Sequence, residues 1–465
     1  MFPGPPSRFR RVRPNDRRRR RALVAACLWL VAVAVAAGAA PRPLVLDAVE
    51  ITGNSRTPDH VVLRELGLSP GDTVTQGRIL DAVAALQHSN LFESVEPAPR
   101  PGSRPGHVVL GLHVQERGPR WRLGTGSTDL DGWYLIPLEL DLDNQFGRGE
   151  YNRLQLRFGY RHAGVVAHYL EGGSGSRPGW WGVDLGAVTT DRLYFLQGVE
   201  VTHRVDRTWA SLRTGRWLGN DWWTEVSLRR ESADAAPGAQ VNVSDPAHGV
   251  EEGDPVPAAL LPAAIRDAAG VRRRTLAAWR LGRDSRSRER WAATPVSGTW
   301  GRLRAWFTAQ DAGPDYGAAE LDLRLYRRAG PGVLAWRGLG AVVGRAAPFY
   351  DRLYLGGLYT VRGVPSQSLS PPTGDTWSWH SSLEYRVPLL GDPALPRLAG
   401  LLFGDVGRGG DLDAGPSHDP RAAVGWGLRY RLGPWITAGI DVGVPLGPTP
   451  TPDAFRVHAA LEWGF

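Results

Sequence analysis

One arginine of this chain stands among glycines in a way that suits a buried ion pair. Arg362 is preceded by a glycine pair at 356–357 and followed by Gly363. Because glycine takes positive φ and lets a backbone approach a wall closely, this segment can fold back and bury the guanidinium. A buried guanidinium needs carboxylate partners, and we expect Glu384 and Asp405, on the next strand-like segments, to supply them. The alternative for an Arg-Gly pair in a loop is an ordinary solvated turn.

The elements that must position this arginine are strands. Aliphatic side chains alternate with polar ones at 136–143, 154–160 and 321–325. A soluble β-sandwich would show the same alternation. The chain also has 19 tryptophans, many of them near expected strand ends, as the aromatic girdles of a membrane barrel require. Residues 119–465 therefore predict an antiparallel transmembrane β-barrel.

We expect sixteen strands in this barrel. An even number places both barrel ends on the side of the amino-terminal module, with short turns there and the long segments 232–272 and 345–377 on the other side. The longer of these, 232–272, includes an expected helix at 258–269. The expected strands lie near 120–127, 133–143, 151–160, 163–171, 180–189, 207–217, 221–231, 273–283, 298–309, 318–327, 332–344, 378–388, 398–407, 421–431, 435–443 and 454–465.

Residues 43–117 mix strand and helix periods and predict one small α+β domain. Its order is β-α-α-β-β, and a turn at Gly53 and Asn54 follows the first strand. Thr57 is the expected N-cap of the first helix. The expected elements are Leu44–Ile51, Pro58–Leu66, Gln76–Gln87, Leu91–Pro97 and His107–Glu116.

The formal charge of +8 is confined to the amino terminus. Residues 1–39 hold nine arginines and one aspartate, so the remainder is close to neutral, which argues against nucleic acid as a partner. Arginines 17–21, the apolar stretch 22–37 and small residues up to Ala39 predict a secretory signal peptide; a permanent membrane anchor is the alternative. Cys27, the single cysteine, lies inside that segment, so we expect neither disulfides nor thiol chemistry in the mature protein.

At this point the motifs resemble a known family. The first domain resembles a POTRA domain, and the rest resembles the sixteen-stranded barrel of the BamA- and TamA-like outer-membrane insertase and translocator superfamily, also called the bacterial surface antigen family. The resemblance covers about 43–465. In the barrel it rests on Val361-Arg-Gly363 with Glu384 and Asp405. In the first domain it rests on Ile51–Asn54, Gly71–Asp72, Ser89–Val95 and Val114–Glu116.

This resemblance implies a loop that folds into the barrel lumen, where Val361, Arg362 and Gly363 are clamped by Glu384 and Asp405. Likewise, Leu461, Trp463 and Phe465 resemble a carboxy-terminal assembly signal, although they could simply end a strand. Asn144, Gly147 and Gly149, together with Gly124 and Gly126, resemble the first strands and turn of such barrels, and ordinary turn chemistry explains them equally well.

The implied function is assembly, insertion or translocation of proteins at the outer membrane, with the POTRA domain in the periplasm. The implied partners are outer-membrane lipids, unfolded or nascent outer-membrane or secreted proteins, and accessory assembly proteins. A passive channel and a dedicated two-partner-type secretion transporter are the alternatives. An enzyme is not expected, because the sequence has no G-x-S-x-G or H-E-x-x-H motif and no cysteine pair; no cofactor or metal site is expected either.

Overall fold

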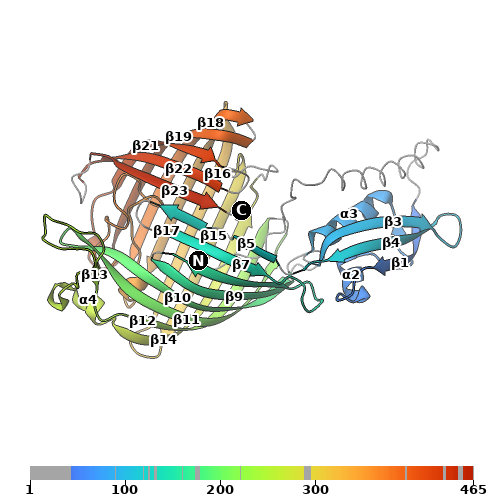
Figure 1. Cartoon of the computed structure of the whole chain (residues 1–465), viewed down its shortest axis with the longest axis horizontal. Helices are drawn as coiled ribbons and strands as arrows, with labels where there is room; N and C mark the ends of the chain where they lie inside the picture. The colour runs from blue at the N-terminus through green and yellow to red at the C-terminus, as the bar shows by residue number, and fades with distance from the viewer. Residues whose placement is uncertain are drawn as a thin grey trace.

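The computed structural model describes most of the chain after residue 42 (Figure 1). The predicted signal peptide, Gly124 and Phe465 lie outside the described residues. No helix among the described residues is long and apolar enough to span a membrane. The described ranges are 43–89, 91–118, 120–123, 126–129, 134–159, 161–172, 179–219, 221–286, 295–392, 395–432, 436–448 and 454–463.

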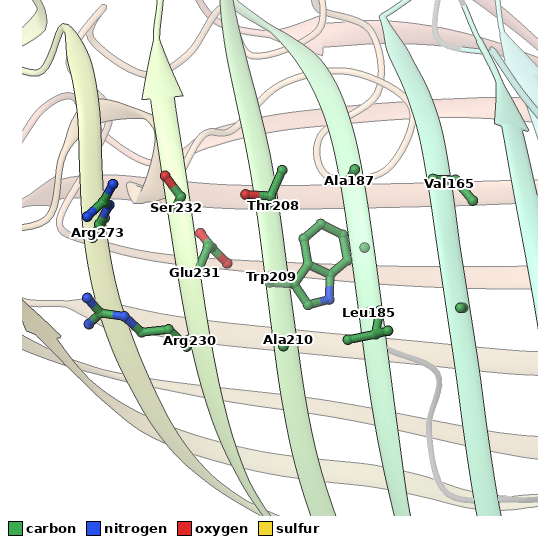
Figure 2. A pocket seen from close by; sticks show the side chains of 12 residues that line it. Val165, Leu185, Ala187, Thr208, Trp209, Ala210, Arg230, Glu231, Ser232 and Arg273 are labelled. Carbon is green, nitrogen blue, oxygen red and sulfur yellow. The ribbon is translucent and has the colours of Figure 1, made fainter.

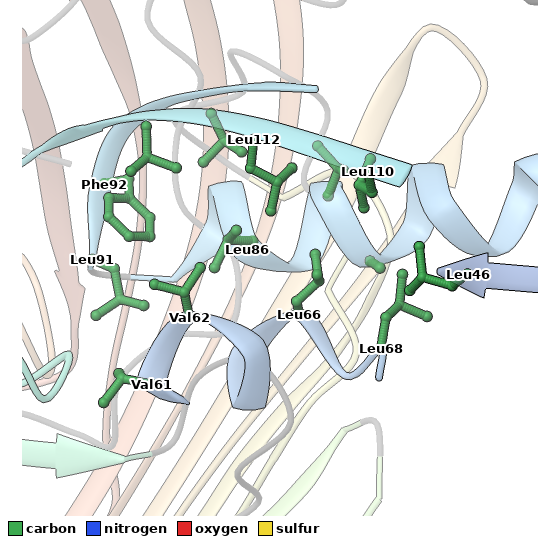
Figure 3. Close-up of a cluster of buried hydrophobic side chains, with 14 of the residues drawn as sticks. Leu46, Val61, Val62, Leu66, Leu68, Leu86, Leu91, Phe92, Leu110 and Leu112 are labelled. Atoms are coloured by element: carbon green, nitrogen blue, oxygen red, sulfur yellow. The ribbon is translucent and has the colours of Figure 1, made fainter. Parts of the chain in front are cut away.

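The amino-terminal domain is a four-stranded sheet covered by two helices. Its strand order is β2-β1-β4-β3, with β1 and β4 parallel and β3 and β4 antiparallel. The helices cover one face of the sheet and bury leucines and valines against it (Figure 3). The elements are β1 (Leu44–Thr52), α2 (Asp59–Leu66), β2 (Thr73–Val74), α3 (Gln76–His88), β3 (Phe92–Pro101) and β4 (His107–Glu116).

Two details of this domain differ from the sequence prediction. The short strand β2 was not predicted, because two residues carry no readable period. Thr57 is not the N-cap of α2; Pro58 occupies that position with extended φ and ψ. The Thr57 hydroxyl instead donates to Glu116 Oε1 at 2.8 Å, so a long-range carboxylate took the place of the local cap.

The second part of the chain is a closed antiparallel barrel. Within the described residues it contains sixteen full strands, as predicted, when β5 and β6 are taken as one interrupted strand and the two-residue pieces β13 and β20 are set aside. The strands are β5 (Arg120–Leu123), β6 (Gly126–Asp129), β7 (Tyr134–Asp141), β8 (Tyr151–Phe158), β9 (His162–Gly172), β10 (Gly179–Leu196), β11 (Val199–Trp217), β12 (Trp222–Ala235), β13 (Gln240–Val241), β14 (Gly270–Asp284), β15 (Gly298–Gln310), β16 (Tyr316–Ala329), β17 (Gly332–Val343), β18 (Trp377–Asp392), β19 (Leu395–Asp411), β20 (Gly415–Pro416), β21 (Arg421–Arg431), β22 (Ile436–Leu446) and β23 (Arg456–Trp463).

The strands expected at 180–189 and 207–217 leave a long connection between them, and this prediction is wrong. Strand β10 continues to Leu196 and β11 begins at Val199, joined through Gln197 and Gly198, both with positive φ. This extension carries polar side chains on its outward face, such as Arg204, so its apolar period is weak although its pairing is regular. The helix expected at 258–269 is also broken, into η1 (Ala258–Leu260) and α4 (Ala263–Arg266).

Strand β16 shows how the wall separates lipid from lumen. Leu321 and Leu325 are 42% and 47% exposed on the outer face. Between them Asp322 is 2% exposed and accepts from Arg324 and Arg337 at 2.9 and 3.1 Å inside the barrel. A soluble sandwich would show the reverse, so apolar side chains outside and ion pairs inside are the arrangement of a transmembrane barrel.

A hollow of about 600 Å³ lies in the wall between β9 and β14 (Figure 2). Small side chains such as Ala187 and Ala210 line it. Gly186 leaves room for the indole of Trp209, because a Cβ there would lie 2.1 Å from that ring. This wall is remote in strand order from the strands that hold Arg362.

Candidate functional site: a loop clamped inside the barrel

Three glycines shape the loop between β17 and β18. Gly356, Gly357 and Gly363 have φ of 113°, 90° and 90°, as the sequence predicted. A Cβ on Gly356 would lie 2.5 Å from the carbonyl oxygen of Pro365, and one on Gly363 would lie 3.1 Å from the backbone of Gly443 in β22. The loop therefore turns sharply and its tip rests directly on the barrel wall.

Arg362 is buried at this tip and faces Asp405 of β19. Its Nε and Nη2 donate to the two oxygens of Asp405 at 2.7 and 2.8 Å, and its backbone N–H donates to the same carboxylate at 3.1 Å. The two residues are 4% and 3% exposed. This is a bidentate, charge-assisted pair, which fixes the orientation of the guanidinium and also neutralises its charge.

Two further carboxylates complete the ion cluster. Arg362 Nη1 lies 2.8 Å from Glu384 of β18 and 3.3 Å from Asp441 of β22. Each of these carboxylates also has an arginine of its own, since Arg386 pairs with Glu384 and Arg429 pairs with Asp441, both at 2.7 Å. Within the described part of the chain, three arginines therefore balance three carboxylates.

The residues beside Arg362 anchor the tip by other means. Val361 and Val364 are 0% and 2% exposed and pack with apolar side chains of the loop and of β21. The N–H of Gly363 donates to Nε2 of His458 in β23 at 3.0 Å. The guanidinium of Arg362 also stacks over Phe403, 3.6 Å from the ring centroid.

The structure thus brings together Val361, Arg362, Gly363, Glu384 and Asp405. Sequence reasoning missed two partners, and the described strands show why. Asp441 and His458 lie 79 and 96 residues after Arg362 in separate strands, and only barrel closure places them near it. Their signal was a charged residue on an otherwise apolar strand, as in Ile440-Asp-Val442.

The other predicted site residues lie away from this cluster. Leu461 is 38% exposed in β23, the last strand, where Trp463 is the final described residue. Gly53 has φ of 90°, and a Cβ there would lie 2.0 Å from the carbonyl oxygen of Val114. The amide of Asn54 donates to the carbonyl of Thr57 at 2.9 Å, so this turn leads the chain into α2.

The turn between β7 and β8 contacts the amino-terminal domain. Asn144, with φ of 55° and 0% exposure, donates through its amide to Thr57 Oγ1 at 2.8 Å and to the carbonyl of Leu91 at 3.3 Å. Its Oδ1 accepts from the N–H of Gly149 at 3.0 Å. A Cβ on Gly147 would lie 2.4 Å from the Arg56 carbonyl. These positions therefore dock the barrel turn onto the domain as well as shaping the turn.

Glu116 organises the domain side of this contact. Its carboxylate accepts from the Ser55 hydroxyl at 2.8 Å and from the backbone N–H groups of Arg56 and Thr57 at 2.9 and 2.6 Å. Burial alone would raise the pKa of Glu116, but these hydrogen bonds hold that pKa below its ordinary value of 4.5.

Two family models match the chain. Residues 320–458 match the Omp85 superfamily domain, and residues 45–117 match the POTRA family, described as a surface antigen variable number repeat. The chain therefore contains an Omp85 superfamily domain and a POTRA domain. Its barrel lies in the outer membrane, and its single described POTRA domain lies in the periplasm.

Curated relatives of this Omp85 protein match over short stretches. A putative outer membrane protein assembly factor of Treponema pallidum is 35% identical over 72 residues, which is 16% of this chain and 9% of that protein. The outer membrane protein assembly factor BamA of Nitratidesulfovibrio vulgaris is 23% identical over 128 residues, 28% of this chain and 16% of that protein.

Solved structures match over nearly the whole fold. BamA from Haemophilus ducreyi lacking POTRA domains 1–3 superposes with a TM-score of 0.70 at 14% identity, covering 91% of this chain and 86% of that one. CdiB from Acinetobacter baumannii gives 0.54 at 13% identity, covering 90% and 74%. At these identities the likeness establishes the fold alone.

Proposed function

We propose that this Omp85 protein assembles proteins into the outer membrane or translocates them across it, with clients bound by the POTRA domain and processed at the barrel. The observation that carries the proposal is a POTRA domain docked through Asn144 onto a barrel whose lumen holds a clamped loop. A passive channel needs neither a client-binding domain nor a fixed junction between that domain and the barrel.

The closing seam of the barrel supports this proposal. Among the described residues, β23 pairs with β6 at four positions, from Ala460 with Asp129 to Trp463 with Gly126. By contrast, β11 pairs with β12 at thirteen positions. Since this seam joins the first and last full strands of the barrel, we place the pairing of a client strand there.

The POTRA sheet limits where an extended client can pair. Its described edges are β2 and β3, whereas Val108 and Leu110 are buried in the interior strand β4. Gly102 donates its N–H to the His107 carbonyl. By the register of the two strands, the backbone N–H and C=O groups of even-numbered β3 residues point toward β4, and those of odd-numbered residues point toward the free edge. The prolines of β3 take three of those outward positions, at 97, 99 and 101.

A proline has no N–H to offer, so β3 lacks three donors along its free edge. We therefore place client pairing at the β2 edge, where Thr73 is exposed. Arg362 contributes separately, by holding the loop in one position so that the lumen keeps one shape.

Photocrosslinking in native membranes tests this function. A photoreactive residue replaces Thr73 on β2, Leu461 at the seam, or Ala98 on the proline-rich edge as the matched control. We expect adducts with nascent outer-membrane proteins from Thr73 and Leu461 and far fewer from Ala98.

Each other outcome selects another reading. Adducts with a single secreted protein would indicate a dedicated transporter. No protein adducts, together with a steady ion conductance that unfolded protein does not alter, would contradict the proposal and leave a passive channel. Equal adducts from Thr73 and Ala98 would show that the prolines of β3 do not direct clients to the β2 edge. The proposed assembly function would still stand.

A further inference from the structure

A second buried ion cluster lies in the barrel, apart from the one around Arg362, and it also involves the loop. Asp351, in the 3-10 turn η2 (Phe349–Asp351), accepts from the Tyr316 hydroxyl at 2.6 Å and from Arg207 Nη2 at 2.9 Å. It also pairs with Arg274, which is 1% exposed. One phenol and two guanidiniums thus converge on the carboxylate of a single loop residue.

The backbone of the same turn is held as well. Arg192 and Arg207 each donate to the Tyr350 carbonyl at 3.1 Å, and Arg192 also donates to the Arg352 carbonyl at 3.4 Å. Phe349, 1% exposed, lies in an aromatic cluster with its ring centroid 4.9 Å from that of His203. The barrel wall therefore contacts both the side chains and the main chain of this turn.

The two clusters belong to nearly opposite walls. Arg207 is in β11 and Asp405 is in β19, and along the sheet order six full strands separate β11 from β19 in one direction and eight in the other. Figure 1 shows β10–β14 along the lower wall and β18–β23 along the upper wall. The loop leaves β17, contacts the first wall at η2 and reaches the second wall at Arg362.

We propose that Asp351 is a second positioning residue of this loop, which ties the loop to the β10–β16 wall so that it crosses the lumen as a strut fixed at both ends. The Arg362 cluster alone would let the preceding segment swing about the tip. With Asp351 in place, both ends are fixed and the segment between them obstructs the lumen. This inference concerns ion passage through the barrel and stands whether or not the protein handles clients.

The charges at the second cluster explain why one substitution should loosen the loop there. Arg274 also donates to Glu231 at 2.6 Å, and Arg207 lies 3.7 Å from the same carboxylate. Arg229 also donates to Glu231, at 3.0 Å, so three arginines face two carboxylates, of which only Asp351 comes from the loop. Asp351→Asn leaves Glu231 on the wall as the carboxylate that contacts Arg207, Arg229 and Arg274, while the loop loses its charge.

The test is ion conductance of the full-length protein in planar lipid bilayers, with heat-modifiable gel mobility to show that the barrel is folded. Asp351→Asn is compared with Asp413→Asn, a matched control that removes the exposed pair of Asp413 with Arg345 at the start of the same loop. We expect a folded Asp351→Asn barrel whose open-channel events are about tenfold more frequent than those of the wild type or the control.

Tyr316→Phe is the milder second variant, because it removes one hydrogen bond and no charge. We expect it to give an intermediate increase, and Asp351→Asn combined with Arg362→Ala to exceed the sum of the two single variants. Folded Asp351→Asn barrels that conduct like Asp413→Asn would overturn the proposal. If Asp351→Asn and Tyr316→Phe both fail to give a folded band, the cluster serves barrel folding and the proposal also fails.

Discussion

Replacing Arg362 by alanine is the substitution whose cost can be estimated most directly. The guanidinium and its partner Asp405 are both more than nine-tenths buried and share two bonds of 2.7 and 2.8 Å. The other two carboxylates of the cluster keep arginines of their own, so Asp405 is the one left without a cation among the described residues. Removing one partner of such a pair costs about 3 to 5 kcal/mol, because the remaining charge stays buried.

Two companion variants separate charge from geometry. Arg362→Lys keeps the charge but loses the planar fork, so we expect a smaller loss of about 1 to 3 kcal/mol. Arg362→Ala together with Asp405→Ala removes both charges, so its cost should be less than the sum of the single costs.

The assay is guanidinium-induced unfolding in lipid vesicles, followed by tryptophan fluorescence, since the chain has 19 tryptophans. A loss below about 1 kcal/mol for Arg362→Ala would refute the reasoning, because the pair would then be too weak to hold the loop. Additive costs in the double variant would show that Arg362 and Asp405 do not act on each other.

Three further predictions concern the POTRA domain and its junction with the barrel. Asn144→Ala should weaken the docking of the POTRA domain by about 1 to 3 kcal/mol, because buried polar groups lose their amide partner. The distribution of spin-label distances between domain and barrel should then broaden. Asn144→Gly, which tolerates positive φ, should broaden it equally if loss of the amide is the cause. Gly53→Ala should lower the melting temperature of the POTRA domain more than Gly106→Ala, since both have positive φ but only Gly53 would meet a backbone atom at 2.0 Å; equal effects would contradict the contact argument. The pKa of Glu116 is lowered on folding, so its stabilisation is complete above the ordinary value of 4.5 and is lost as pH falls below it; calorimetry of the full chain should show this fall in the wild type and a weaker one in Glu116→Gln, and identical pH profiles would argue against it.

The barrel was predictable from sequence because lipid and lumen impose a period of two on each strand. Alternating segments such as Leu321–Leu325 therefore placed the strands well. Long external extensions did not follow this rule. In the segment from Asp191 to Arg204 the exposed face is polar, as at Arg204, and buried apolar side chains such as Val201 lie on the other face, so the outward apolar period no longer marks it as strand.

The clamp was only partly predictable, and the limit is physical. Arg362 could be recognised locally because glycines flank it, and Asp405 because it interrupts a strand. Asp441 and His458 reach the same place through the closure of the sheet, which no local pattern encodes. Asp351 was missed for a related reason, since its partners come from strands that precede it by up to 144 residues.

The most direct test of the assembly proposal is reconstitution. Purified full-length protein in lipid vesicles is presented with an unfolded outer-membrane protein, and the fraction that becomes folded and protease-resistant is measured over time. We predict faster insertion than in empty vesicles, with a reduced rate for Arg362→Ala. If insertion is no faster than in empty vesicles, and no unfolded polypeptide enters the vesicles either, the assembly and translocation account is wrong.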